Sequence, residues 1–158
     1  MAETALRHFL GSVVIDEVSL AAASPEQERE RKIAVSDLLK ANYFEPDAGP
    51  GGPYALTIGL VDDRLGLDVA GEGYERRHLL SLAPFRRIVR DYITICESYN
   101  EALRNASPSQ IESIDMGRRG LHNDGSELLR ERLAGKVSTD LATARRLFTL
   151  ICALHWRG

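Results

Sequence analysis

The sequence has little of what marks membrane or secreted proteins. No segment approaches the roughly 18 apolar residues that cross a bilayer, and the first residues hold an early acid, Glu3, but no apolar run of signal-peptide length. We therefore expect a cytoplasmic protein without a membrane segment. There are only two cysteines, Cys96 and Cys152, and both lie inside apolar helical patterns. We expect them to be buried and reduced, because a free thiol behaves as a small hydrophobe.

Familiar catalytic motifs are absent too. The chain contains no P-loop, no dinucleotide-binding glycine fingerprint, no G-x-S-x-G nucleophile elbow and no paired-cysteine motif. Its four histidines share no metal-ligand spacing, and the two cysteines add none. We expect neither a metal site nor a cofactor.

What is present is typical of an ordinary soluble globular protein. Of the 158 residues, 44% are hydrophobic and 27% are charged, which is unlike a disordered chain. A chain of this length buries roughly two-thirds of the surface that it exposes when unfolded. We expect a single domain over residues 1–158.

Charge is divided unevenly along the chain. Residues 1–75 contain 6 Lys and Arg against 14 Asp and Glu, whereas residues 76–158 contain 14 against 9. Seventeen of the 20 basic residues are arginines, and they include four Arg-Arg pairs, at 76–77, 86–87, 118–119 and 145–146. The planar guanidinium group suits carboxylates and phosphates, so the second half could bind an anion. Alternatively, the two halves pair with each other.

The first half predicts a strand, a helix and a loop. A β-branched run at 13–18 predicts the strand. Ser24-Pro25-Glu26-Gln27 combines an N-cap serine, a proline at the first helical position and a capping-box glutamine, which predicts a helix over 25–42. Residues 45–53 contain three prolines and three glycines and predict a loop.

Alternating apolar residues then predict a small sheet. The segments 54–60 and 65–69, separated by the turn residues Asp62 and Asp63, predict a hairpin. Residues 75–82 add a third strand after another turn. The result is an antiparallel meander that the first strand could extend.

The rest of the chain predicts three helices. The first begins at Pro84 and carries an apolar stripe made of Ile88, Val89, Tyr92, Ile93, Cys96, Tyr99 and Leu103. Ser107 caps the second, which runs to Gly135, and the last covers about 139–156. The predicted fold class is α+β, in which an N-terminal helix and a small antiparallel sheet (about 1–82) pack against a C-terminal three-helix cluster (about 83–158).

Residues 116–126 are the strongest candidate for a binding or catalytic site, because they combine two arginines, a histidine, an amide, a carboxylate and three glycines. If the chain bends at Gly120 or Gly125, backbone N–H groups could bind a phosphate at a helix N-terminus. If it stays helical, Gly117 and Gly125 share a face and let a neighbouring helix approach closely, at a cost of about 1 kcal/mol per glycine. We favour the continuous helix.

His122 and Asp124 are the candidate catalytic residues. The ordinary pKa of histidine, about 6.5, suits general acid and base catalysis. Asp124 could orient the imidazole, and Asn123 could orient a substrate. The alternative is a histidine that is hydrogen-bonded into a helix interface. The preceding arginine pair is too close to His122 for the arginine–spacer–histidine motif of HEPN ribonucleases, so that motif is not met.

Arginines of different helices could converge into a basic surface. The candidate binding residues are Arg86, Arg87, Arg90, Arg118, Arg119, His122 and Asn123, and the pair Arg145 and Arg146 could join them. Nucleic acid would also need aromatic residues beside the charge, and the few near such positions, Tyr92, Tyr99 and Trp156, are more typical of a core. We favour an acidic protein surface or an anionic small molecule as the partner.

Five blocks of the sequence carry a family resemblance. They are GGPYALTIGLVDDRL at 51–65, HLLSLAPFRRIVRDY at 78–92, CESY at 96–99, SPSQIESIDMGRRGLHNDGSELLRERL at 107–133 and TARRLFTLICALHWRG at 143–158. They resemble the alphaproteobacterial uncharacterised protein family of UPF series 0262. The resemblance implies a bacterial, cytosolic protein and transfers no activity, cofactor or catalytic residue.

Three functional hypotheses follow. The first is a non-enzymatic regulatory or interaction domain whose arginine-rich helical face binds an acidic partner or an anionic small ligand. The second is a phosphate-handling hydrolase or nuclease in which His122 is the general acid or base and Arg118 and Arg119 stabilise a phosphoryl oxygen. The third is a homodimer formed through the last helix. We favour the first, because it needs no reactive group.

Overall fold

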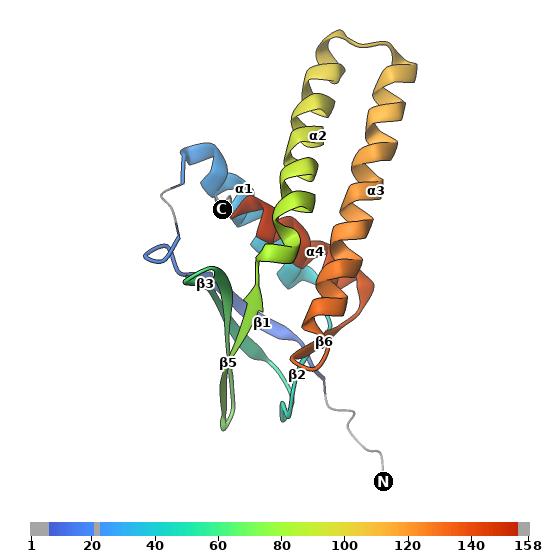
Figure 1. Ribbon diagram of the computed structural model, residues 1–158. Coiled ribbons are helices and arrows are strands. Elements are labelled where there is room, and N and C mark those ends of the chain that lie inside the picture. The colour runs from blue at the N-terminus through green and yellow to red at the C-terminus, as the bar shows by residue number, and fades with distance from the viewer. Residues whose placement is uncertain (1–6, 21–22, 155–158) are drawn as a thin grey trace.

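The computed structural model describes residues 7–20 and 23–154 and has the predicted α+β class (Figure 1). In chain order its elements are β1 (Leu10–Ile15), α1 (Pro25–Lys40), β2 (Phe44–Pro46), β3 (Tyr54–Val61), β4 (Arg64–Gly71), β5 (Tyr74–Ser81), a 3₁₀ turn (Ala83–Phe85), α2 (Arg86–Asn105), α3 (Pro108–Leu133), β6 (Val137–Thr139) and α4 (Leu141–Ala153).

The main sheet has the strand order β1-β3-β4-β5. Strands β3, β4 and β5 are antiparallel neighbours, which confirms the predicted meander. The first strand does extend it, but β1 runs parallel to β3, with Val13 opposite Leu56 and Ile15 opposite Ile58. Parallel neighbours need a crossover connection, and α1 lies in that connection.

The first strand begins and ends earlier than predicted, at 10–15 rather than 13–18. Asp16 provides a physical reason for its end. The Asp16 carboxylate accepts a hydrogen bond from the backbone N–H of Val18 at 3.1 Å. Such a local side-chain to backbone bond competes with strand pairing.

A second, two-stranded sheet corrects part of the predicted loop at 45–53. Strand β2 pairs antiparallel with β6, so that Phe44 lies opposite Thr139. The Phe44 side chain is fully buried. This pairing joins segments that are remote in sequence, and the local prolines and glycines carry no signal of it.

The helix ends agree closely with the sequence signals. Ser24 and Ser107 each form a capping box with the glutamine three residues later. The first helix ends at Lys40, slightly before the predicted residue 42. Gly135 follows α3 with a φ of +87°, as expected of a glycine just past a helix.

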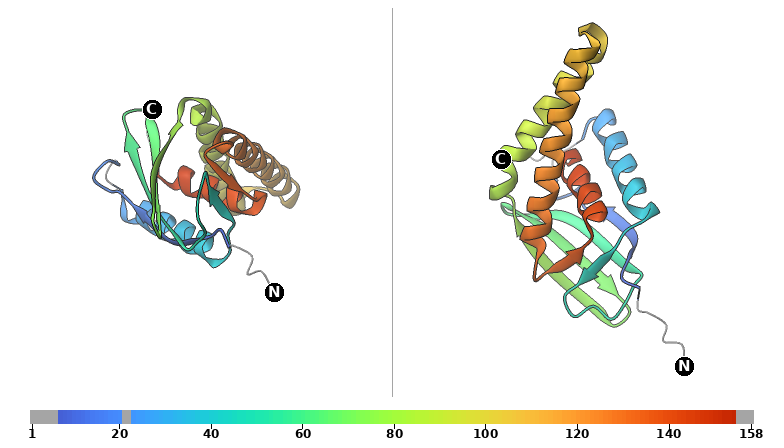
Figure 2. Two further views of the ribbon diagram at one scale, coloured as in Figure 1. Left: turned by 90° about the horizontal axis from the view of Figure 1, so that it is seen from below. Right: turned by 90° about the vertical axis from the view of Figure 1, so that its right-hand side faces the viewer.

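Residues 117–125 form continuous α-helix inside α3, as we favoured. The alternative of a phosphate site in a bend at Gly120 or Gly125 is wrong, because the N–H groups of a helix interior are used within the helix. Figures 1 and 2 show that α2 and α3 form a hairpin projecting past the rest of the molecule. Leu103, near its far end, is 55% exposed rather than part of a buried stripe.

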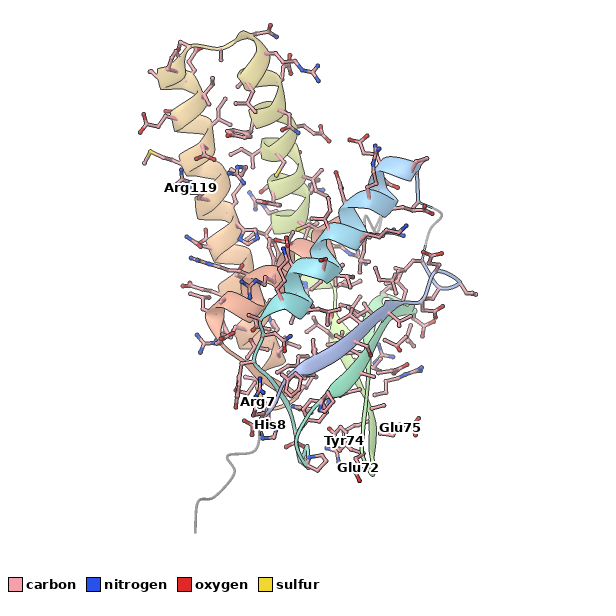
Figure 3. The ribbon with its side chains drawn as sticks, turned by 180° about the vertical axis from the view of Figure 1, so that it is seen from behind. Arg7, His8, Glu72, Tyr74, Glu75 and Arg119 are labelled. Carbon is pink, nitrogen blue, oxygen red and sulfur yellow. The ribbon has the colours of Figure 1, made fainter. Side chains whose placement is uncertain are left out.

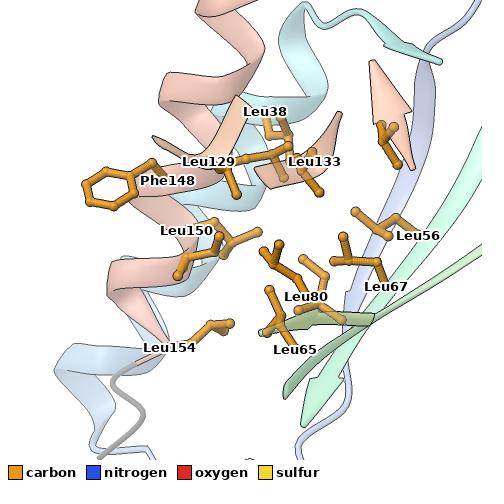
Figure 4. Packing of buried hydrophobic residues seen from close by; sticks show 14 of the residues in the cluster. Leu38, Leu56, Leu65, Leu67, Leu80, Leu129, Leu133, Phe148, Leu150 and Leu154 are labelled. Carbon is orange, nitrogen blue, oxygen red and sulfur yellow. The ribbon is translucent and has the colours of Figure 1, made fainter. Parts of the chain in front are cut away.

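The core is built around α4 (Figure 4). Side chains of α1, α3 and the sheet surround it, and the fully or nearly fully buried ones include Leu38, Leu56, Leu65, Leu67, Leu80, Leu129, Leu133, Phe148, Leu150 and Leu154. Most apolar side chains of the described part of α4 are buried inside the molecule, with Leu141 and Ala142 as exceptions, so little apolar surface remains there for the dimer predicted through the last helix. This helix ends at Ala153, and the predicted extension through His155 to Trp156 lies outside the described residues.

A buried arginine of α1, Arg31, forms hydrogen bonds with the C-terminal end of α4. Arg31 is only 4% exposed. Its guanidinium group donates hydrogen bonds to the carbonyl oxygens of Ala153 at 3.2 Å and Leu154 at 2.8 Å. The last carbonyls of a helix lack partners within the helix and favour a positive charge, so Arg31 stabilises this helix end.

Gly125 sets the approach of α3 to α4. A Cβ atom at Gly125 would lie 2.2 Å from Cζ of Phe148, and one at Gly117 would lie 2.9 Å from Cδ1 of Ile95. A Cβ atom at Gly120 would meet no heavy atom within 4 Å. The Phe148 ring is fully buried and closely packed, so it has little room to move away.

Alanine should therefore have opposite effects at two glycines of one helix. Gly125→Ala should lower the free energy of unfolding by about 1–3 kcal/mol, since overpacking against Phe148 outweighs the gain in helix propensity. Gly120→Ala, the matched control, should raise it by about 0.5–1 kcal/mol, because the new methyl group meets nothing. Urea unfolding measures both. Equal stability of the two variants would contradict the close contact.

Candidate functional site

A pocket of about 430 Å³ lies between α2, α3 and α4. We call it the basic pocket, because three arginines line it. Its lining consists of Tyr92 from α2, Arg118, Arg119, His122 and Asn123 from α3, and Arg145 and Thr149 from α4. Four of the seven predicted binding residues are thus brought together.

One carboxylate holds the arginine pair of α3. Arg118 donates to Oδ1 of Asp115 from Nη2 at 2.5 Å and from Nε at 3.1 Å, and Arg119 donates from Nε to Oδ2 at 2.9 Å. The spacing of three and four residues places all three side chains on one face of the helix. The hydrogen bonds from Arg118 and then Arg119 hold the pKa of Asp115 below its ordinary value.

The two arginines differ in exposure and in their aromatic contacts. The guanidinium carbon of Arg118 lies 4.8 Å from the centre of the Tyr99 ring, a cation–π contact, and its side chain is 31% exposed. The Arg119 side chain is 71% exposed (Figure 3). Arg118 is thus a fixed charge in the pocket, whereas Arg119 faces the solvent.

The third arginine comes from the other side of the pocket. Nη2 of Arg145 donates to Oδ1 of Asn123 at 2.5 Å. Arg145 has no ion pair with a carboxylate among residues 7–20 and 23–154. A guanidinium group carries five N–H donors, so most of those on Arg145 remain for a ligand.

His122 is bonded across the α3–α4 interface. Its Nε2 lies 2.7 Å from Oγ1 of Thr149, and the Thr149 hydroxyl donates to the carbonyl oxygen of Arg145 at 3.1 Å. A hydroxyl has one hydrogen to donate, so we assign the proton to Nε2 of His122. The imidazole also packs between Tyr92 and Phe148, with ring centres 5.3 and 5.4 Å away. This is the interface histidine of the alternative interpretation.

The remaining predicted site residues lie elsewhere. Asp124 is exposed and does not line the pocket, since residues two apart on a helix do not face the same way. Arg86, Arg87 and Arg90 are near the start of α2, outside the pocket lining. Arg86 lies 3.9 Å from a carboxylate oxygen of Asp63. The arginines therefore do not merge into one patch around the pocket.

The sequence indicates Arg145 only as an arginine that could join the basic surface, and it does not indicate Thr149. They are four residues apart on α4, on the face opposite its buried positions. That spacing was a usable signal, because neighbours at i and i+4 share a helix face. Nothing local connects them to α3, because that contact depends on tertiary packing.

The pairing of the two chain halves accounts for other arginines. Ion pairs across the halves join Arg76 to Asp47 at 3.0 Å, Arg77 to Asp68 at 2.6 Å and Arg86 to Asp63. Among the described residues, Asp115 is the one carboxylate that forms an ion pair with an arginine of the basic pocket, and it belongs to the same helix as Arg118 and Arg119. Three arginines against one carboxylate leave this pocket with an excess of positive charge.

The two cysteines differ in burial, although the sequence predicts that both are buried. Cys152 is buried and Cys96 is half-buried, and neither forms a disulfide. Burial raises the pKa of each thiol, so both are protonated at neutral pH. Within the described ranges, no group of three or more His, Cys, Asp or Glu residues could hold a metal ion, and no helix is long and apolar enough to cross a membrane.

Comparison with known proteins confirms the family resemblance. The model of the Uncharacterised protein family (UPF0262) matches residues 7–157. A UPF0262 protein of Phenylobacterium zucineum is 66% identical over 152 residues, 96% of each chain. One of Caulobacter vibrioides is 64% identical over 151 residues, 96% of this chain and 95% of the relative. A third, from Rhizobium meliloti, is 55% identical over 151 residues, which are 94% of this chain and 95% of the relative. No solved structure matches the chain.

Stability should fall as the pH drops through the range in which histidine titrates. Burial, followed by the charges of Arg145 and Arg118, holds the pKa of His122 below its ordinary value. As the pH falls, the unfolded chain therefore takes up a proton on this histidine before the folded chain does. The contribution of His122 to the free energy of unfolding is complete above about pH 6.5 and is lost as the pH falls toward the lower pKa of the folded state. His122→Gln should reduce this decline. It should not abolish it, because burial also lowers the pKa of His78.

Urea unfolding at several pH values between about 7.5 and 5 measures this effect, since the lowered carboxylate pKa values act only at lower pH. If the wild type and His122→Gln lose stability equally, His122 is not the titrating group.

Proposed function

The chain belongs to the Uncharacterised protein family (UPF0262), and we propose that it is a non-enzymatic regulatory or interaction domain that binds an anion in the basic pocket. The recognised group is a carboxylate or phosphate, carried by an acidic partner protein or by a small molecule. Arg118, Arg119 and Arg145 bind it, and Asn123 positions Arg145.

The convergence of three arginines from two helices carries the proposal. Among the described residues the one carboxylate paired with any of them is Asp115, and the lowered pKa of His122 favours the neutral imidazole at neutral pH. Positive charge is therefore in excess inside a concave site. An arginine bonded to a carboxylate or phosphate forms charge-assisted and often bidentate hydrogen bonds, which are stronger than neutral ones.

The rigid parts of the pocket support binding. Asp115 and the Tyr99 ring hold Arg118 in place before any ligand arrives. Less side-chain entropy is then lost on binding than for a mobile arginine. Arg119 is also bonded to Asp115, but its side chain is mostly exposed, and Arg145 lacks a described carboxylate partner, so both present N–H donors to an incoming anion.

A phosphate-handling hydrolase or nuclease is the second candidate, favoured by the presence of His122 in the same pocket. Binding is better supported, for two reasons. The imidazole is already committed to Thr149, and the predicted orienting carboxylate, Asp124, is not in the pocket. Turnover of phosphate esters, nucleotides or RNA that disappears in His122→Ala would favour the enzyme instead.

Charge reversal in the pocket tests the binding proposal. We expect the wild type to bind at least one of three probes, namely inorganic phosphate, citrate and a pentaglutamate peptide. Arg145→Glu and Arg119→Glu should each weaken that binding about tenfold or more, because each removes a charged hydrogen-bond donor and adds repulsion. Isothermal titration calorimetry at low and moderate salt measures the affinities.

Arg132→Glu is the matched control. Arg132 is an exposed arginine of the same helix and does not line the pocket, so its reversal makes the same change in net charge. The proposal fails if all three variants bind alike, or if the wild type binds none of the probes. Circular dichroism of each variant checks that the fold is intact.

A further inference from the structure

The two edges of the main sheet are protected very differently. The strand order places β1 at one edge and β5 at the other. Strand β5 contains three consecutive charged residues, Glu75, Arg76 and Arg77, whereas β1 (LGSVVI) contains no charged residue and no proline. Charged residues and proline are common means of preventing edge-to-edge pairing. Strand β1 lacks both, and the register shift in its pairing with β3 is confined to its start, between Leu10 and Ser12.

Backbone groups of β1 face away from the sheet. Asp16 N–H donates to the carbonyl of Ile58 at 2.8 Å, which directs residue 16 toward β3. Because hydrogen-bonding direction alternates along a strand, Val14 also faces β3, while Val13 and Ile15 direct their backbone groups outward. Among the described residues no strand pairs with that side.

The start of this edge is already occupied by a side chain. Asn42 accepts a hydrogen bond from the N–H of Leu10 at 2.7 Å and donates to its carbonyl oxygen at 3.3 Å. The amide of Asn42 thus imitates one residue of a neighbouring strand. An added strand could not pair with Leu10, because the N–H and carbonyl groups of that residue are already bonded to Asn42.

A groove of about 790 Å³ runs beside the same edge, between β1 and α1. Val13 and Ile15 line it from the strand, and Val35 and Leu39 line it from the helix. Val13 and Ile15 are opposite Leu56 and Ile58 of β3 and so point to the core face of the sheet. These four lining residues are only partly buried. The edge of the hydrophobic core is therefore partly exposed to solvent along the groove. Figure 3 shows α1 and β1 along this side of the molecule.

The two ends of the groove carry opposite charges. Glu17 follows the end of β1 and Lys40 ends α1, and both line the groove. Lys40 lies at the other end of the strand, because Asn42, two residues later, is bonded to Leu10. Glu17 therefore marks one end of the groove and Lys40 the other. Lys40 also forms an exposed ion pair with Asp37 at 3.3 Å, and Glu28, Arg31 and Lys32 line the groove between its ends.

We propose that a second copy of the chain occupies this groove, with its β1 antiparallel to the first across a two-fold axis. Main-chain hydrogen bonds would join the two β1 strands, as in other cases of strand addition at a sheet edge. The two four-stranded sheets then form one continuous sheet. Val13 and Ile15 of each copy lie beside the groove of the other.

Charge and symmetry favour a second copy over an unrelated peptide. An antiparallel partner places its Glu17 next to Lys40, and the two-fold axis creates this contact twice. The strand also brings its own apolar residues, spaced two apart as the groove requires. Val14, on the opposite face of β1, is 57% exposed, and pairing would cover part of it. This interface is independent of the basic pocket.

Sedimentation equilibrium over a wide concentration range tests the dimer. We expect the mass to rise from 17.5 kDa toward twice that value. Hydrogen exchange at the Val13 and Ile15 amides should slow with concentration, whereas exchange at Val14 should change little, because its N–H is already directed to β3. A monomer at every concentration, or a dimer without this protection, would overturn the proposal.

Charge exchange identifies the contact. Glu17→Lys and Lys40→Glu should each weaken dimerisation about tenfold, because each change creates two like-charge contacts. The double variant should restore it. Both side chains are exposed, so the fold should tolerate these changes. Met116→Lys, at a 67% exposed position on α3, is the control and should dimerise as the wild type does. A double variant as weak as the single ones would contradict the antiparallel arrangement.

Discussion

The burial of α4 is the constraint on which the rest of the structure depends. This helix has the sheet on one side and α1 and α3 on others, and its Phe148 ring occupies space left by the missing side chain of Gly125. A larger residue at 125 would force α3 outward and open the core, since closely packed interiors adjust poorly to added volume. Arg31 fixes α1 at the far end of the same helix. One buried helix thus sets the positions of two others.

Both proposed binding surfaces follow from this arrangement. Because α3 approaches α4 closely, Arg118 and Arg145 come to opposite sides of one pocket, and the His122–Thr149 hydrogen bond joins its walls. Because α1 is drawn toward α4, it lies beside β1 without covering the rim of the core, and a groove remains. The pocket carries excess positive charge, whereas the groove combines the apolar side chains of Val13, Ile15, Val35 and Leu39 with charged residues of both signs. The two surfaces therefore suit different partners, a small anionic group and a second protein strand.

Local signals predicted much of the fold. The capping boxes at Ser24 and Ser107, the hairpin and meander, and the glycine after α3 all depend on residues close in sequence. Contacts between remote segments were not predicted, and they include the β2–β6 pairing and the parallel direction of β1. The same difference between local and remote contacts applies to the candidate site. Arg118, Arg119, His122 and Asn123 were identified because they are neighbours on one helix, whereas the contribution of Arg145 depends on how α4 packs.

We propose that the arginines of the basic pocket bind anions while similar arginines elsewhere on the chain do not. Nuclear magnetic resonance of the arginine Nε–Hε groups distinguishes the two sets, because each guanidinium reports its own contacts. On titration with pentaglutamate, the signals of Arg118, Arg119 and Arg145 should move and saturate together, and those of Arg104 and Arg132 should stay in place. Equal, unsaturated shifts at all five would indicate general screening by charge and would contradict the account.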